Sequence, residues 1–538
     1  MEDVRRPPVG KRSFRRAFVG SSFMNRIHQA IIAFFSHRAR RVVSAAVVLN
    51  VASLTLASIS PGGAIADSRI AKILPKITER VTERTLSNGM RVLFYRRGSA
   101  PVFSAVVAVR VGGIDEQQGS TGISHLLEHM AFKGTPEIGT KDYAREQPLL
   151  EKQEQLRETA RSRALTPEEQ AELEKVESAL AALWLPQQLD EELDRRGVVG
   201  LNATTSKELT SYFLSLPRGA FSYWCWLESD RLLRPVMRLF YQERDVVLEE
   251  RRMRYENDPE GKLYEEILAT AFTRHPYRQP VIGYEADLKR LRASELAAFH
   301  RNFYVASRMS LAIVGDVDPD RDLPVVERYF GRIPNRKVKE GPRVQEPPQT
   351  EERRLSLRLK AAPRLAVAYH KPAYPHPDDP PLSVLEEVLA GSSLSPMYQE
   401  LVKKRGVATS VDVSEGPGSL DPNLILFDVG SRSNIGNRPN LAAFDDVIAS
   451  TLRDGVEPHA VELAKRSIAR DFLDNLRSSS SIAGTLASSM TLYGDWQVMF
   501  RWFEETMAVK PEDVNRVARS YLQPANRTVA TIEPEGAP

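Results

Sequence analysis

The chain has 538 residues, of which 42% are hydrophobic and 27% charged, with a formal net charge of +4. This length allows two or three globular domains, and the apolar content excludes a disordered chain. Much of the basic excess lies in the first 41 residues, where a nucleic-acid-binding arm is one interpretation. The segments that follow favour export instead, so we expect no nucleic-acid partner.

An export signal is predicted within residues 1–66. The basic region is followed by the apolar stretch Val42–Ala57, the helix-breaking segment Ser60–Gly63 and the small-residue pattern Ala64–Ala66. This order is typical of a secretory signal peptide that is cleaved after Ala66. The alternative is an uncleaved N-terminal membrane anchor, although the apolar stretch is short for a spanning helix. We expect a periplasmic or otherwise exported protein that meets a membrane only if this segment is retained.

The first folded domain is expected over residues 67–334, and one of its predicted helices carries His125, Glu128 and His129. The two histidines are four residues apart, one helical turn, so their side chains project together and could bind one metal ion. Glu128 lies on the same side, where a carboxylate can accept a proton without being a ligand. HxxEH is the inverted form of the zinc-protease signature. With nine histidines in the chain, a chance match on a solvated helix has a probability of about 1%.

A helical hairpin is predicted as an insertion in this domain, at about residues 146–188. Glu, Gln, Leu, Arg and Ala, which are strong helix formers, dominate the segment. Thr166, Pro167 and Glu169 form a capping box between two amphipathic runs. Substrate binding, a partner contact and a merely solvated surface hairpin all remain open as its role.

Two glutamates farther along, Glu243 and Glu250, lie in a predicted helix at Tyr241–Arg252. They are seven residues apart, two helical turns, and therefore share one face. One could bind a metal while the other orients the site. The residues alone favour a solvated, charged helix face, because Glu and Arg are dense here.

The second half of the chain resembles the first. Leu382–Ala390 reads like Ile123–Ala131, with valines in place of both histidines, and Tyr521 aligns with Tyr304. The two offsets are 259 and 217 residues and differ by 42, which is about the size of the predicted hairpin. This pattern predicts a duplicated αβ domain whose metal site belongs to the first copy only.

A polar, proline-containing stretch at 335–350 predicts the linker between the two copies, so that the second domain covers residues 351–538. Apolar strands mixed with longer helical segments on both sides predict α+β domains.

Several motifs together make the chain similar to the pitrilysin/insulinase-type zinc peptidases, nearest to their mitochondrial-processing-peptidase-like branch. The similarity extends over most of residues 80–535. The motifs that carry it are HxxEH with its continuation to Thr135, Asn202–Thr205, Glu243–Glu250, His275–Tyr277 and Val314–Val317.

This resemblance implies that Glu250 is the third zinc ligand, that Glu243 orients the site and that Glu128 is the general base. It also implies that Asn202 and Ala203 hold the substrate backbone at a strand edge. Without the resemblance, Asn202 is more simply an ordinary turn residue. The implied fold is α+β, with two homologous αβ domains, each a mixed sheet covered by helices, forming half of a clam-like peptidase. The implied activity is endoproteolysis by metal-activated water, with one zinc ion per chain.

The chain departs from the family pattern in its second domain. Members that complete the substrate site carry an Arg and a Tyr seven residues apart, where this chain has Val402 and Thr409. The departure points to a heterodimer in which a homologous, zinc-free subunit supplies the pair. The alternative is that Lys403 or Arg405 serves instead. A second hypothesis for the function is a non-catalytic scaffold or peptide-binding subunit, although scaffold members typically lose ligands that are present here.

Overall fold

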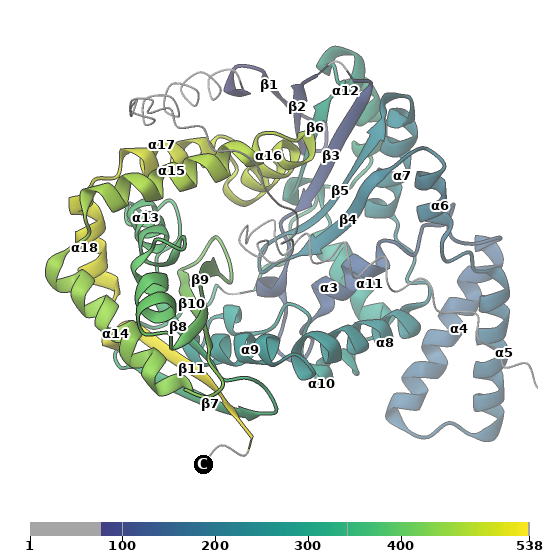
Figure 1. Cartoon of the computed structure of the whole chain (residues 1–538). Coiled ribbons are helices and arrows are strands. Elements are labelled where there is room, and N and C mark those ends of the chain that lie inside the picture. The colour runs from purple at the N-terminus through teal and green to yellow at the C-terminus, as the bar shows by residue number, and fades with distance from the viewer. Residues whose placement is uncertain (1–76, 99, 342, 536–538) are drawn as a thin grey trace, which may run out of the picture. The chain divides into compact units, whose positions relative to one another are not determined.

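The computed structural model describes residues 77–98, 100–341 and 343–535 and builds them into two β-sheets covered by helices (Figure 1). The predicted export signal, residues 1–66, lies outside these ranges. Across the described ranges, no helix combines the length and the apolar character that crossing a bilayer requires.

The first half of the chain forms a six-stranded sheet in the order β1-β2-β6-β3-β5-β4. Strands β2 and β6 are parallel, and the other neighbouring pairs are antiparallel. The strands are β1 (Val81–Thr85), β2 (Arg91–Arg96), β3 (Val102–Val109), β4 (Val199–Thr205), β5 (Thr210–Pro217) and β6 (Met309–Gly315).

The second half forms a five-stranded sheet in the order β7-β11-β8-β10-β9, which corresponds strand by strand to β2-β6-β3-β5-β4. The directions correspond as well, because β7 and β11 are parallel and the remaining pairs antiparallel. The predicted duplicated α+β fold is therefore confirmed. The strands are β7 (Arg353–Leu359), β8 (Arg364–Lys371), β9 (Ala408–Gly416), β10 (Asn423–Ser431) and β11 (Arg527–Pro534).

The helices connect and cover these strands. In the first half they are α3 (Ile123–Met130), α4 (Tyr143–Ser162), α5 (Pro167–Leu183), α6 (Gln188–Asp194), α7 (Phe221–Leu233), α8 (Phe240–Arg251), α9 (Pro259–Ala271), α10 (Glu285–Leu288), α11 (Ala293–Phe303) and α12 (Pro319–Phe330). In the second half they are α13 (Asp379–Ala390), α14 (Asn437–Asp454), α15 (Pro458–Asn475), α16 (Ser479–Tyr493), α17 (Val498–Ala508) and α18 (Pro511–Tyr521). Two segments, Arg252–Glu256 and Tyr398–Lys404, are π-helical.

Both faces of the first sheet are buried. In β2, Val92 and Phe94 pack in one apolar core while Leu93 and Tyr95 pack in another, because successive side chains of a strand point to opposite faces. The continuous apolar run reflects helices on both sides of the sheet.

Each half of the chain covers one face of the other half's sheet with a helix, as Figure 1 shows. Helix α16 packs on the first sheet, where Leu486 and Val106 share a core. Helix α9 packs on the second sheet, where Ile267 and Ala368 share a core. The segment predicted as the second domain thus supplies part of the core of the first sheet, and the reverse also holds.

The linker carries no helix or strand among its described residues and is attached to the first half by Glu346. The carboxylate of Glu346 accepts hydrogen bonds from the backbone N–H groups of Thr273, Arg274 and His275, at 2.7, 2.8 and 2.9 Å. In the same turn, Nδ1 of His275 accepts a hydrogen bond from the backbone N–H of Tyr277. The His-Pro-Tyr motif therefore shapes the turn that receives the linker.

Helices α4 and α5 form the predicted hairpin. The predicted capping box lies at the start of α5. The hydroxyl of Thr166 accepts from the backbone N–H of Glu169 at 3.2 Å, and the carboxylate of Glu169 accepts from the backbone N–H of Thr166 at 2.9 Å.

Two contacts fasten this hairpin beside α8, the helix that carries Glu243 and Glu250. Glu146 forms an ion pair with Arg238 at 2.6 Å, and both side chains are fully buried. Tyr241, in the first turn of α8, donates a hydrogen bond to Glu154 of α4 at 2.7 Å. The hairpin therefore supports the start of a helix on which two predicted site residues lie.

Candidate metal centre

Helix α3 is embedded in the first sheet's core by its apolar residues, of which Leu126, Leu127 and Met130 are fully buried. The helix begins after Gly122, whose φ of 86° is a left-handed conformation that favours glycine. A Cβ atom at this position would also lie 2.4 Å from the carbonyl oxygen of Ile282. Gly122 therefore lets the chain turn into α3 while its backbone lies directly against Ile282.

The N-terminus of α3 is capped by Glu116, a buried side chain that the sequence did not indicate. Its carboxylate accepts hydrogen bonds from the backbone N–H groups of Gly122 and Ser124, at 2.8 and 2.9 Å. Burial raises the pKa of Glu116 to about 7, although these hydrogen bonds counteract the shift. The cap satisfies donors that a helix start otherwise leaves unpaired.

The structure brings His125, His129 and Glu250 together. Nε2 of His125 lies 3.9 Å from Oε1 of Glu250, and Nε2 of His129 lies 3.4 Å from Oε2. The two imidazole rings have centroids 4.7 Å apart, and one ligand atom from each residue lies within 4.8 Å of the others. Among the described residues, no second group of three or more His, Cys, Asp or Glu converges in this way.

These three side chains suit a zinc ion. Two imidazoles and a carboxylate form one of the donor sets of catalytic zinc sites, which keep a fourth position open. Ligand atoms at bond lengths of about 2.0–2.1 Å around a tetrahedral ion lie roughly 3.3 Å apart. The 3.4 Å separation of Glu250 from His129 is close to this value, and the 3.9 Å separation of Glu250 from His125 is longer.

Glu243 contacts the second histidine from the side opposite to Glu250. Its Oε1 lies 2.9 Å from Nδ1 of His129, and its Oε2 lies 2.7 Å from Nζ of Lys133. Burial lowers the pKa of His129, but hydrogen bonds to Glu243 and Glu250 outweigh this effect and raise it to about 10. Burial favours a higher pKa for Glu250, yet its hydrogen bond with His129 and the charge of His125 hold the pKa below its usual range.

Glu128 lies at the same centre and is buried, yet it does not belong to the converging group. The hydroxyl of Thr205, at the end of β4, donates a hydrogen bond to its Oε2 at 2.5 Å. Burial raises the pKa of Glu128, and the charge of His129 and the Thr205 hydrogen bond offset this only in part. The net effect is a carboxyl whose pKa lies above its usual range.

Asn202 and Ala203 lie on β4, the last strand of the first sheet, which packs beside α3. The side-chain oxygen of Asn202 accepts a hydrogen bond from the backbone N–H of Ala203 at 2.8 Å, and the Ala203 side chain is buried in the core. Within the described part of the chain, β4 pairs only with β5, so its other edge faces away from the sheet.

Four contacts at this centre were not predicted from the sequence. They come from Glu116, Lys133, Thr205 and Arg254, and Nη2 of Arg254 lies 3.0 Å from Oε1 of Glu250. Thr205 ends the Asn202–Thr205 run that carried part of the family resemblance, which is a signal that could have identified it.

Val402 and Thr409, which occupy the positions of the family's Arg and Tyr, offer no cation and no phenol. Val402 packs against the second sheet's core, and the hydroxyl of Thr409 donates to the carbonyl oxygen of Gly430 at 3.0 Å. Arg405, one of the two alternative cations, is paired with Glu400 at 2.9 Å and Asp446 at 2.8 Å.

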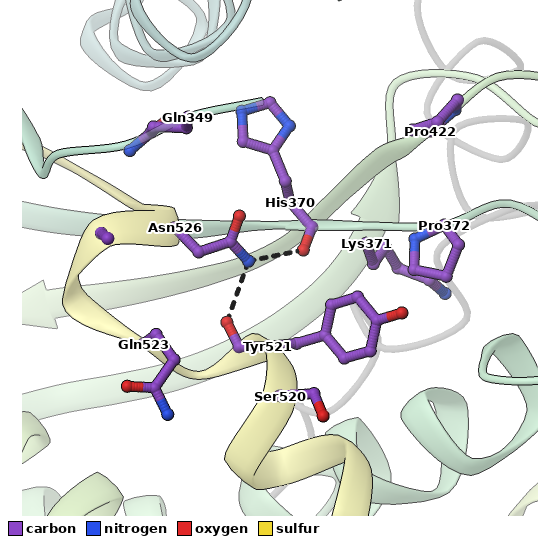
Figure 2. Close-up of a pocket in the computed structure, with 10 residues that line it drawn as sticks. Gln349, His370, Lys371, Pro372, Pro422, Ser520, Tyr521, Gln523 and Asn526 are labelled. Atoms are coloured by element: carbon purple, nitrogen blue, oxygen red, sulfur yellow. Dashed lines mark hydrogen bonds between the residues drawn. The ribbon is translucent and has the colours of Figure 1, made fainter. Parts of the chain in front are cut away.

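A surface pocket of about 430 Å³ lies in the second half, and none of its lining residues belongs to the predicted site (Figure 2). Asn526 shapes it by donating hydrogen bonds from Nδ2 to the backbone carbonyls of His370 and Tyr521, at 2.8 and 2.9 Å. The pocket is therefore distinct from the residues grouped around α3.

Two αβ domains of equal topology, one with an HxxEH helix and a converging glutamate, define a class of metallopeptidase folds. Comparison with known families agrees. The family described as "Insulinase (Peptidase family M16)" matches residues 91–151, and "Peptidase M16 inactive domain" matches residues 290–468. The chain belongs to the M16 peptidase family, the insulinase and pitrilysin group that its motifs predicted.

Its relatives include named zinc proteases. The zinc protease PqqE of Helicobacter pylori is 26% identical over 461 residues, covering 84% of this chain and 92% of that protein. A mitochondrial-processing peptidase subunit beta of Lentinula edodes is 23% identical over 462 residues, covering 81% of this chain and 86% of that protein. The crystal structure of a protease from Helicobacter pylori matches with a TM-score of 0.71 and 24% identity, covering 84% of this chain and 99% of that chain, a likeness that concerns the fold.

Proposed function

We propose that this protein is a zinc-dependent endopeptidase that cleaves peptides or unfolded protein segments. The observation that carries the proposal is the convergence of His125, His129 and Glu250 around one point, with Glu128 held beside it by Thr205. Relatives that are named zinc proteases support the same reaction class.

A zinc ion at this point would polarise the scissile carbonyl and lower the pKa of the attacking water. Glu128 is the general base: its buried carboxylate takes a proton from the attacking water and then delivers it to the leaving amine. Thr205 keeps one carboxylate oxygen of Glu128 in place through its short hydrogen bond. The raised pKa of Glu128 suits a group that must carry a proton between these two steps.

Glu243 orients the centre. By occupying Nδ1 of His129, its carboxylate leaves Nε2 as the nitrogen that faces Glu250. Strand β4 lies beside α3, and among the described residues no strand pairs with its outer edge, so a substrate backbone can extend the sheet there at Asn202 and Ala203.

A homologous, zinc-free subunit is proposed as the partner, because Val402 and Thr409 provide no cation or phenol to bind the substrate and stabilise an oxyanion. A relative that is itself named a subunit supports this assembly. The second candidate function is a non-catalytic scaffold or peptide-binding subunit, which the match to a domain described as inactive favours. Export to the periplasm, by the segment at residues 1–66, is part of the same proposal.

Metal analysis and two substitutions test the proposal. Glu128→Gln should keep zinc and lose turnover by about 10²-fold or more, because the proton acceptor is removed while the ligands remain. His129→Ala should lose zinc itself. Digestion of a random peptide pool, read by mass spectrometry, measures turnover. Activity and zinc retained in both variants would exclude the mechanism, and zinc binding without any cleavage would favour the peptide-binding alternative.

The partner and the export signal need separate tests. Protein purified with its co-purifying subunit should cleave faster than the chain alone, and equal rates with and without it would remove the heterodimer. N-terminal sequencing of the exported protein should begin at Asp67, and an intact N-terminus would indicate a retained anchor.

A further inference from the structure

Arg254 reaches the metal centre from the segment that follows α8. Its Nη2 lies 3.0 Å from Oε1 of Glu250, and its side chain is 36% exposed. The two other arginines after Glu250 pair elsewhere: Arg251 with Glu265 at 2.8 Å and Arg252 with Glu249 at 2.5 Å. Arg254 is therefore the arginine of this cluster that contacts a predicted ligand.

A π-helical turn and close packing against α9 fix the backbone of Arg254. Residues Arg252–Glu256 form a π-helical turn, which the backbone N–H of Asn257 closes on the carbonyl oxygen of Arg252 at 2.8 Å. The carbonyl oxygen of Arg254 lies against Gly261 of α9, where a Cβ atom would be only 1.8 Å away. Only glycine allows this approach, so α9 fixes the position from which Arg254 reaches Glu250.

Helix α9 is itself anchored in the second sheet. Its Leu263 and Ile267 share a core with Ala368 and Ile532 of strands β8 and β11. The buried ion pair between Arg251 and Glu265 fastens the end of α8 to the same helix. The second half of the chain thus reaches Glu250 through α9 and Arg254.

We propose that Arg254 is a positioning residue of the metal centre. Its guanidinium holds Oε1 of Glu250, which leaves Oε2 directed at His129. This inference rests on the proposed function, because it assigns Glu250 as a ligand. A glutamate side chain has three rotatable bonds, and a fixed partner reduces the ordering that metal binding otherwise requires.

The charge of Arg254 acts in the opposite direction from its positioning. A cation 3.0 Å from a ligand carboxylate repels a divalent ion, so its removal alone would tighten zinc binding. Positioning predicts weaker binding after removal. The sign of the change in zinc affinity therefore distinguishes a positioning residue from a mere counter-charge.

The experiment compares Arg254→Gln and Arg254→Lys with the matched control Arg252→Gln in the full chain. Arg252 lies in the same π-helical turn, and its ion pair with Glu249 is exposed. The zinc dissociation constant is measured by competition with a chromogenic chelator, and thermal unfolding of the metal-free proteins checks folding. Arg254→Gln should weaken zinc binding about 10-fold or more, Arg254→Lys should recover part of it, and the control should match the wild type.

A second readout is the visible absorption of the cobalt-substituted proteins, which follows ligand geometry. Arg254→Gln should change this spectrum, whereas Arg252→Gln should not. Unchanged or tighter zinc binding by Arg254→Gln overturns the inference while leaving the proposed function intact. If the wild type binds no zinc, the proposed function and this inference both fail. If Arg254→Gln folds poorly, the lysine variant decides. Its zinc affinity must then be lower than that of the wild type, and an affinity equal to the wild type counts against the positioning role of the guanidinium.

Discussion

Replacing Glu243 by Gln tests how the centre prepares His129 for a metal ion. The substitution preserves the size of the side chain but removes the negative charge that lies 2.9 Å from Nδ1 of His129 and 2.7 Å from Lys133. Partners of metal ligands typically contribute 10–100-fold to metal affinity, or about 1.4–2.7 kcal/mol. We expect this loss to depend on pH.

The pH dependence follows from the pKa of His129, which is about 10 in the metal-free centre. Below that pH zinc must displace a proton, so wild-type zinc affinity should rise about 10-fold per pH unit between pH 6 and 9. Glu243→Gln removes part of the support for the proton, so the pKa of His129 falls and zinc affinity rises less steeply. The variant should therefore bind zinc much more weakly than wild type at pH 9 and nearly as well at pH 6.

The assay is chelator competition at several pH values, with Glu249→Gln as control. Glu249 is an exposed glutamate on the same helix and pairs with Arg252. A ratio of wild-type to variant affinity that stays constant from pH 6 to 9 would refute this account of His129. Equal effects of the two substitutions would show that only the charge of the helix matters.

Thr205→Val should lower kcat about 10-fold or more with zinc content and KM unchanged, because a hydrogen bond to a charged group contributes about 1.5–3 kcal/mol. Thr204→Val, one residue earlier on β4, is its control, and an equal loss there would indicate damage to the strand. Glu146→Ala should reduce the free energy of unfolding in urea by about 3–5 kcal/mol, because it leaves the charge of Arg238 buried without a partner; a change below about 1 kcal/mol would contradict this. The metal-free protein should lose stability as the pH rises from about 6.5 to about 10, since folded His129 binds its proton more tightly than unfolded His129 does. Thermal unfolding at pH 7 and pH 9.5 measures this effect, and a higher Tm at pH 9.5 would count against it.

The duplicated fold could be predicted because its signals are local. Apolar runs, helix caps and the match between the segments at Ile123 and Leu382 are all visible along the chain. The covering of each sheet by α9 and α16 could not be predicted. An amphipathic helix indicates that one face will be buried, but it does not indicate against which sheet.

The same distinction applies to the centre. His125 and His129 share one helix, so their spacing predicts that they lie together. Glu250 lies on another helix, and its approach depends on tertiary packing, so the prediction required the family resemblance. Thr205 is a single hydroxyl on a strand, a residue type with no spacing of its own. Arg254 belongs to an arginine-rich run that reads as a solvated face, and the π-helical turn decides which member reaches Glu250.

The reciprocal placement of α9 and α16 means that the two halves of this chain are not independent folding units. Cleavage inside the linker would leave α9 on the first fragment, without the second sheet that it covers, and α16 on the second fragment, without the first sheet that it covers. Both fragments would then expose apolar surface to solvent. Experiments on the separate halves must therefore keep them in one chain or produce both fragments together, so that they can assemble during synthesis.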